Sequence, residues 1–164
     1  MVSEEAQMQT IGEQSGRLAQ VIAAVERASA QVPTIQMIVR GDAFKLNACA
    51  SAKYPAFAWV QGVHTLTEDW RMLRVSLTLF YIDRLNEQQD NTLQIQSAGV
   101  EALADILQRC EGAGVYTDGQ ITYQPFTQRF ADECAGVFAN VVLTAPATTL
   151  CADDITSDNN LIII

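Results

Sequence analysis

The fold is decided by the stretch WRMLRVSLTLFYI, residues 70–82. Apolar side chains occupy every second position from Leu73 to Tyr81, and the positions between them are polar until Phe80. A period of two is typical of a β-strand with one buried face. Because Phe80 and Ile82 are also apolar, both faces become apolar in the second half. The pattern predicts a long strand whose second half enters a two-sided core or a subunit contact.

A helix is expected before this strand. Thr10 and Glu13 have the spacing of a capping box, and a start at Ser3 with acidic residues in the first turn is an alternative. Pro33 should end the segment, since proline disfavours helix in the residue before it. The apolar residues with the i, i+3, i+4, i+7 spacing of one helical face are Leu18, Val21, Ile22 and Val25.

A second helix is expected after the strand, beyond the polar residues 86–91. Ser97 is its expected N-cap and Gly112 its expected C-cap. Asp105 and Arg109 have the spacing of a favourable i, i+4 ion pair. The apolar face that should lie on the sheet consists of Val100, Leu103, Ala104 and Leu107.

The remaining segments favour shorter strands. Gly41 and Asp42 fit a two-residue type II′ turn between two of them. Helices separated by runs of strands indicate an α+β domain, with a largely antiparallel twisted sheet and helices packed on one face. We assign residues 1–152 to this single domain and residues 153–164 to a C-terminal tail. The expected strands are residues 35–39, 44–48, 55–60, 121–126 and 137–143.

The charge balance restricts the partners of the protein. A formal net charge of −9 repels phosphate and provides no basic patch for non-specific nucleic-acid binding. No apolar run approaches the roughly 20 residues that span a bilayer. Residues 1–20 are polar and acidic where a signal peptide would be basic and then apolar. We expect a protein made in the cytoplasm that has no membrane partner.

Motifs for catalysis are missing from the sequence. His64 is the single histidine, and it is expected at the surface near a strand end rather than as a general base. The glycines at 112, 114 and 119 follow a helix, whereas a phosphate cradle opens one. The tripeptide Arg40-Gly41-Asp42 is interpreted as a turn rather than an adhesion motif. We therefore predict no enzyme, no catalytic residue and no cofactor.

The cysteines are interpreted as reduced thiols without a metal. Their spacing contains no C-x-x-C pair that could begin a tetrahedral zinc site. Without an export signal, disulfides are also not expected. The four residues are Cys49, Cys110, Cys134 and Cys151.

The C-terminal tail ends in a run of aliphatic residues that we expect to be shielded from solvent. Polar residues 153–160 precede Leu161-Ile162-Ile163-Ile164. A free apolar run of this kind is adhesive unless a strand or groove covers it. Residues 153–160 are long enough to tether it to a neighbouring subunit. Our hypothesis is strand addition across subunits, and an edge strand within the same domain is the alternative.

Other candidates for a subunit interface lie around the long strand. The charged pair Asp83-Arg84 follows it and would fix either an interface or a solvated corner. Trp59 and Trp70 are expected in the core, with an interface as the alternative, because tryptophan is enriched there. The complete set of candidate interface residues is Asp83, Arg84, Trp70, Leu161, Ile162, Ile163 and Ile164.

A set of short motifs lies between residues 11 and 151. They are Leu46-Asn47, Tyr54-Pro55, Phe80-Tyr81-Ile82-Asp83-Arg84, Asn91, Ser97, Phe126, Asp132, Ala135-Gly136, Pro146 and Cys151. Together these motifs resemble the small tail-completion, or neck, proteins of phages and prophages of Bacteroidetes. The order of elements also resembles the tail-terminator fold, in which a twisted antiparallel sheet with flanking helices assembles into a hexameric ring.

The resemblance implies a structural virion protein of a tailed bacteriophage that caps the tail tube or joins tail to head. Its partners would be copies of itself, in a hexameric ring, and other neck and tail tube proteins. DNA would pass through the channel without specific binding, and no residue would be catalytic. The alternatives are a head-completion or adaptor ring of the same neck, or a cytoplasmic small-molecule-binding or enzyme domain without a recognisable motif.

Overall fold

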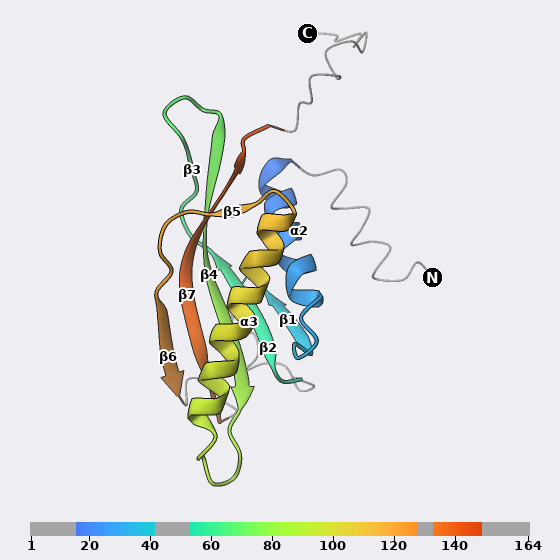
Figure 1. The fold of residues 1–164 in the computed structure, drawn as a ribbon, viewed down its shortest axis with the longest axis vertical. Coiled ribbons are helices and arrows are strands. Elements are labelled where there is room, and N and C mark those ends of the chain that lie inside the picture. The colour runs from blue at the N-terminus through green and yellow to red at the C-terminus, as the bar shows by residue number, and fades with distance from the viewer. Residues whose placement is uncertain (1–15, 42–52, 128–132, 149–164) are drawn as a thin grey trace, which may run out of the picture.

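The computed structural model describes residues 16–41, 53–127 and 133–148. These residues form an α+β fold, as the sequence predicts, with two helices on a mostly antiparallel sheet of seven strands (Figure 1). Side chains of both helices join one core with a single face of the sheet. The strands follow one another across the sheet in the order β1 (Met37–Arg40), β2 (Ala56–Gln61), β4 (Met72–Arg84), β7 (Cys134–Pro146) and β5 (Tyr116–Thr117). Outside this order, β3 (Thr65–Leu66) pairs with β4, and β6 (Tyr123–Thr127) pairs with β7.

Two long antiparallel strands form the centre of the sheet. β4 (Met72–Arg84) pairs with β7 (Cys134–Pro146) along its whole length, from Met72 opposite Pro146 to Arg84 opposite Cys134. The long strand predicted at residues 70–82 is therefore present. It begins at Met72 rather than Trp70, because Trp70 lies in a turn with a φ of 59°.

The shorter strands flank this pair. β2 is antiparallel to β4, whereas β1 runs parallel to β2, from Met37 opposite Ala56 to Arg40 opposite Trp59. The second arm of the predicted hairpin, residues 44–48, lies outside the described residues. The bounds are β1 (Met37–Arg40), β2 (Ala56–Gln61), β3 (Thr65–Leu66), β5 (Tyr116–Thr117) and β6 (Tyr123–Thr127).

The first described helix, α2 (Arg17–Ala30), has Gly16 as its N-cap and ends three residues before Pro33. The predicted starts at Thr10 and Ser3 lie outside the described residues. Leu18 and Ile22 are only partly buried against the core. The buried face consists of Val21, Ala24, Val25, Ala28 and Ser29.

The second helix, α3 (Thr92–Gly112), begins earlier than predicted. Its N-cap is Asn91, and Ser97 lies exposed in the second turn. The Asn91 side chain accepts a hydrogen bond from the Asn86 N–H, so the preceding loop is closed just before the helix. The buried face is also rotated from the prediction, since Val100 is exposed and Ala104 only half-buried. It consists of Ile95, Gly99, Ala102, Leu103, Ile106, Leu107 and Cys110.

Gly114, not Gly112, provides the special conformation at the end of α3. Gly112 is the last helical residue, and Gly114 has a φ of 81°. The Val115 N–H donates to the Cys110 carbonyl, and the Gly114 N–H donates to the Glu111 carbonyl. This pair of bonds is the Schellman motif, which satisfies carbonyls that the helix leaves without partners.

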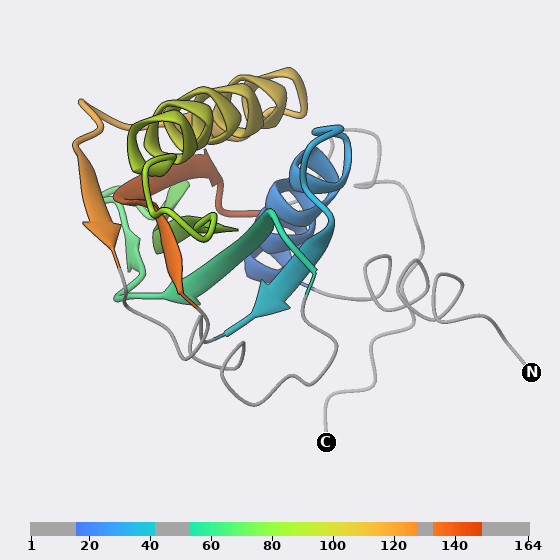
Figure 2. The same ribbon diagram turned by 90° about the horizontal axis from the view of Figure 1, so that it is seen from below.

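Both faces of the sheet carry buried apolar residues near the end of β4. Val75, Leu77, Leu79 and Tyr81 share one core cluster with the buried residues of both helices, and Figure 2 shows the two helices on the same side of the sheet. On the opposite face Phe80 and Ile82 belong to a second buried cluster. The prediction that the second half of this strand enters a two-sided core is therefore confirmed. The other buried members of the second cluster are Val39, Ala56, Ala58, Phe126 and Cys134.

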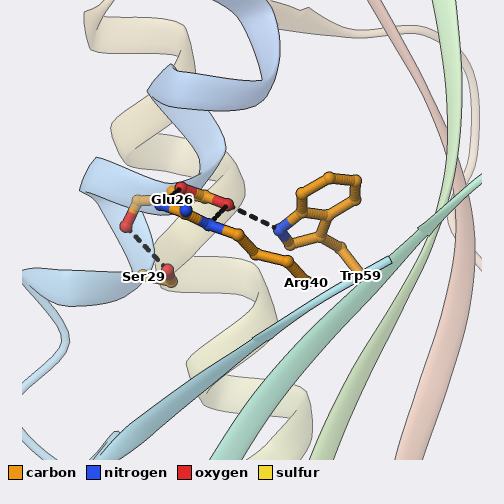
Figure 3. Close-up of polar contacts among 4 residues, drawn as sticks. All are labelled: Glu26, Ser29, Arg40 and Trp59. Atoms are coloured by element: carbon orange, nitrogen blue, oxygen red, sulfur yellow. Dashed lines mark hydrogen bonds and ion pairs between the residues drawn. The ribbon is translucent and has the colours of Figure 1, made fainter. Parts of the chain in front are cut away.

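A partly buried carboxylate attaches α2 to the edge of the sheet. Glu26 of α2 accepts hydrogen bonds from Nε and an Nη of Arg40 on β1, each 2.7 Å long, and from Nε1 of Trp59 on β2 at 3.0 Å (Figure 3). Its side chain is 12% exposed. Trp59 is thus a core residue, as expected. Three donors on one partly desolvated carboxylate fix how the helix crosses the sheet.

Candidate functional site

The candidate interface residues of the sequence do not form one site. Trp70 precedes the first residue of β4, and Asp83 and Arg84 are its last two residues. At about 3.3 Å per residue, they lie roughly 40 Å apart along the strand. The aliphatic residues Leu161 to Ile164 lie outside the described residues. The described candidates therefore lie at two opposite ends of the sheet, either of which could form a subunit interface. Figure 1 shows β4 and β7 running from one end to the other.

At the end of the sheet that carries Arg84, the charged residues make contacts within the same chain. The guanidinium carbon of Arg84 lies 5.2 Å from the ring centroid of Tyr54, a cation–π contact. Asp83 accepts a hydrogen bond from the Arg84 N–H, and the Leu85 N–H donates to the Glu133 carbonyl. Burial raises the pKa of Asp83, and the hydrogen bond from Arg84 opposes this rise. Asp83 and Arg84 thus both make contacts within the chain at this corner.

Several of the motif residues on which the resemblance to neck proteins rests lie near one another at the Arg84 end of the sheet. Gly136 lies opposite Ile82 on β4 and opposite Phe126 on β6. A Cβ atom at Gly136 would lie 1.8 Å from the Tyr81 carbonyl oxygen, so no larger residue fits there. Tyr54 precedes the cis-proline Pro55 at the start of β2. Packing at the end of the sheet accounts for these residue types.

The opposite end is an exposed apolar hairpin, which we call the Trp70 hairpin and define as residues 62–72. Its side chains include Val63, which is 79% exposed, Leu66, which is 53% exposed, and Trp70, which is 77% exposed. The expectation that Trp70 lies in the core is therefore wrong. The reason is that Trp70 lies in the turn before β4, outside the paired strands that carry the core residues.

The turn of the Trp70 hairpin is held by a dense set of hydrogen bonds. The Trp70 N–H donates to the Thr67 carbonyl at 2.8 Å, and the Thr67 N–H donates to the Met72 carbonyl at 3.0 Å. The Asp69 carboxylate accepts from the Thr67 hydroxyl at 2.6 Å and from the Arg71 N–H at 3.2 Å. The bond from Thr67 lowers the pKa of Asp69, and that from Arg71 adds to the effect. The exposed Trp70 therefore lies in a turn that these hydrogen bonds hold in one conformation.

His64 lies at the base of the same hairpin and has a structural role. Its Nδ1 accepts a hydrogen bond from the Ser76 N–H at 3.2 Å, and its Nε2 lies 2.8 Å from Oε1 of Gln61. Because Nδ1 accepts, the proton of the neutral ring must be on Nε2, which donates to Gln61. The half-buried imidazole thus bridges β4 and the end of β2, and both ring nitrogens have partners.

The described residues offer open depressions. One, of about 600 Å³, lies along the Trp70 hairpin and is lined by residues 65–69, Met72 and Arg74. Another, of about 270 Å³, lies between α2 and the end of α3 near Arg27 and Arg109. Within the described ranges no group of three or more histidine, cysteine or acidic residues is arranged to hold a metal.

The described cysteines are buried. Cys110 and Cys134 have no exposed surface, and burial raises the pKa of the Cys110 thiol to about 11. Cys110 is therefore a protonated thiol at neutral pH, the unreactive form. Cys49 and Cys151 lie outside the described residues.

No helix in the described part of the chain is long and apolar enough to cross a membrane. No family model matches the chain, and no curated protein is significantly similar to it.

Proposed function

We propose that this chain is a structural virion protein of a tailed bacteriophage, which forms a ring in the neck that caps the tail tube or joins tail to head. The observation that carries the proposal is the Trp70 hairpin. It presents three apolar side chains to solvent on a turn that hydrogen bonds hold in place. Exposed aromatic and aliphatic side chains on an ordered element are typical of surfaces that bind another protein.

Two further properties support a role in assembly. The motifs between residues 11 and 151 resemble neck proteins, and those at the Arg84 end pack together. The net charge of −9 suits a ring whose channel passes DNA without holding it. Heterologous contacts between copies close into a ring when the rotation between neighbours permits.

The test is the mass and shape of the purified protein. Six copies of the 17.9 kDa chain would give a particle of about 107 kDa by light scattering and a ring in negative-stain images. The measurement should be made alone at high concentration and again with the purified tail tube. A chain that stays monomeric and forms no ring in either condition contradicts the proposal.

A matched pair of variants tests the surface. Trp70→Ser removes the exposed indole from the hairpin, whereas Leu93→Ser removes an equally exposed apolar residue from α3. The first substitution should abolish ring formation, and the second should leave it unchanged. Equal effects of both would show that general hydrophobicity, not the Trp70 hairpin, drives association.

A further inference from the structure

The outer edge of the Trp70 hairpin is a strand edge without a described neighbour. β3 pairs with β4 on one side, from Thr65 opposite Arg74 to Leu66 opposite Leu73. On its other side the sheet has no strand among the described residues, because β1 stops pairing at Arg40 opposite Trp59. An unpaired edge carries backbone donors and acceptors that a further strand can use.

Trp70 has a left-handed backbone conformation at the end of the turn. Its φ of 59° lies in the left-handed region, which is rare for bulky residues. The position that follows a tight turn in a hairpin and needs this conformation is usually occupied by glycine. A large indole is kept there instead, and it is 77% exposed. Strain at an exposed position of this kind is typical of a binding residue.

The C-terminal segment leaves the fold beside this hairpin. The Ala147 N–H donates to the Arg71 carbonyl at 2.7 Å, so the chain is still attached to the hairpin at its last described residues. The next sixteen residues, 149–164, end in Leu161-Ile162-Ile163-Ile164. The described chain therefore ends beside the exposed apolar edge, and the aliphatic run follows it in sequence.

The end of the described chain and the β3 edge lie on opposite sides of β4. At this end the strands run in the order β3, β4, β7, β5. The described chain ends after β7, whereas the edge that has no neighbour among the described residues belongs to β3. A segment that leaves one copy on the β7 side can therefore meet the β3 edge of a neighbour related by rotation. This is a heterologous contact, the kind that closes into rings.

We infer that residues 161–164 of one copy bind along the β3 edge of the next copy and cover Val63, Leu66 and Trp70. This inference rests on the proposed function, because it requires neighbouring copies. Residues 149–160 provide a tether of twelve residues, with an extended reach of about 40 Å. As a flexible chain they would span about 19 Å, whereas adjacent strands are about 4.8 Å apart. The tether is therefore long enough to pass β5, and a cross-linking experiment decides between the β3 edge of a neighbouring copy and that of the same chain.

The test is a cross-link between two different copies. One copy carries Leu66→Cys and a mass tag, and the other carries Ile163→Cys. Both also carry Cys49→Ser and Cys151→Ser, which leaves the buried Cys110 and Cys134 as background. Directly opposed residues of neighbouring strands have Cβ atoms about 5 Å apart, so a shift of about 1 Å brings two cysteines to the geometry of a disulfide. Oxidation should give a dimer that contains one tagged and one untagged chain.

A control copy with Leu93→Cys on α3, an equally exposed position, should give no such dimer. A single chain with both Leu66→Cys and Ile163→Cys that closes on itself, while mixed copies do not cross-link, would overturn the inference. So would the absence of any cross-link to Leu66→Cys. Removal of residues 159–164 should in addition reduce assembly and leave the thermal midpoint of the monomer unchanged. If the midpoint falls by several degrees and assembly is normal, the segment belongs to its own fold.

The outcomes separate this inference from the proposed function. A ring that forms without the cross-link leaves the proposed function in place and overturns the inference. A cross-linked pair that never closes into a ring supports the inference and contradicts the proposed function.

Discussion

Glu26 joins three elements through one carboxylate, and its loss should weaken the attachment of α2. Glu26→Gln removes the charge and directs an amide group toward Arg40, whose two nitrogens each lie 2.7 Å from the carboxylate. We expect the free energy of unfolding, measured by urea denaturation, to fall by about 1–2 kcal/mol. Asp105→Asn breaks the exposed pair with Arg109 within α3 and is the control, with an expected loss below about 0.5 kcal/mol. Equal losses would contradict the special role of Glu26.

Cys110 should make the fold sensitive to alkaline pH. Burial raises the pKa of its thiol from 9.0 to about 11, so the folded state keeps a proton that the unfolded state loses. The contribution of Cys110 to the free energy of unfolding is fully present below pH 9 and is lost as the pH rises from 9 towards 11. Tyr81, whose pKa burial raises to about 12, extends the loss to higher pH. Cys110→Ala should lower stability at pH 7 through the cavity but flatten its decline between pH 9 and 11. An unchanged slope in denaturation experiments would contradict this assignment.

Among the elements, the Trp70 hairpin should tolerate the loss of its tryptophan. Trp70→Gly relieves a left-handed conformation, a gain of about 1–2 kcal/mol, against the entropy cost of glycine, about 0.5–1 kcal/mol. The thermal midpoint should therefore stay constant or rise slightly, although a large aromatic residue has been removed. Leu79→Gly, within the buried part of β4, is the contrast and should prevent stable folding. A marked drop in the midpoint of Trp70→Gly would mean that the indole is part of the core.

How far the elements could be predicted depended on their length. The long strand ending at Arg84 and the helix around Leu103 have many periodic positions, so their type was clear from the sequence. β3 and β5 have two residues each and carry no periodic signal. Ser97 fits the N-cap preference for serine, which considers local sequence alone. The helix instead begins at Thr92, and this earlier start includes Ile95, which is buried in the core. The parallel pairing of β1 with β2 depends on contacts that periodicity does not encode.

The candidate site was harder to predict than the elements. Trp70 was identified as a candidate, but its left-handed φ is the opposite of what an apolar residue before a strand suggests. Arg84 and Tyr54 are thirty positions apart in sequence, and their contact follows from β2 and β4 being neighbours in the sheet. Val63 and Leu66 carried no signal, because exposure of an apolar side chain depends on which strand edges remain unpaired.

For the whole molecule, the net charge of −9 means that neighbouring copies repel one another. Assembly through the apolar Trp70 hairpin must overcome this repulsion, which salt screens over a distance that falls from about 10 Å at 0.1 M to about 3 Å at 1 M. We therefore expect the assembled fraction, measured by light scattering at fixed protein concentration, to rise several-fold as sodium chloride increases from 0.1 to 1 M. Trp70→Gly should remain unassembled at every salt concentration, because screening provides no contact of its own. Assembly that weakens with salt would instead indicate ion pairs between copies as the main attraction, contrary to an apolar contact.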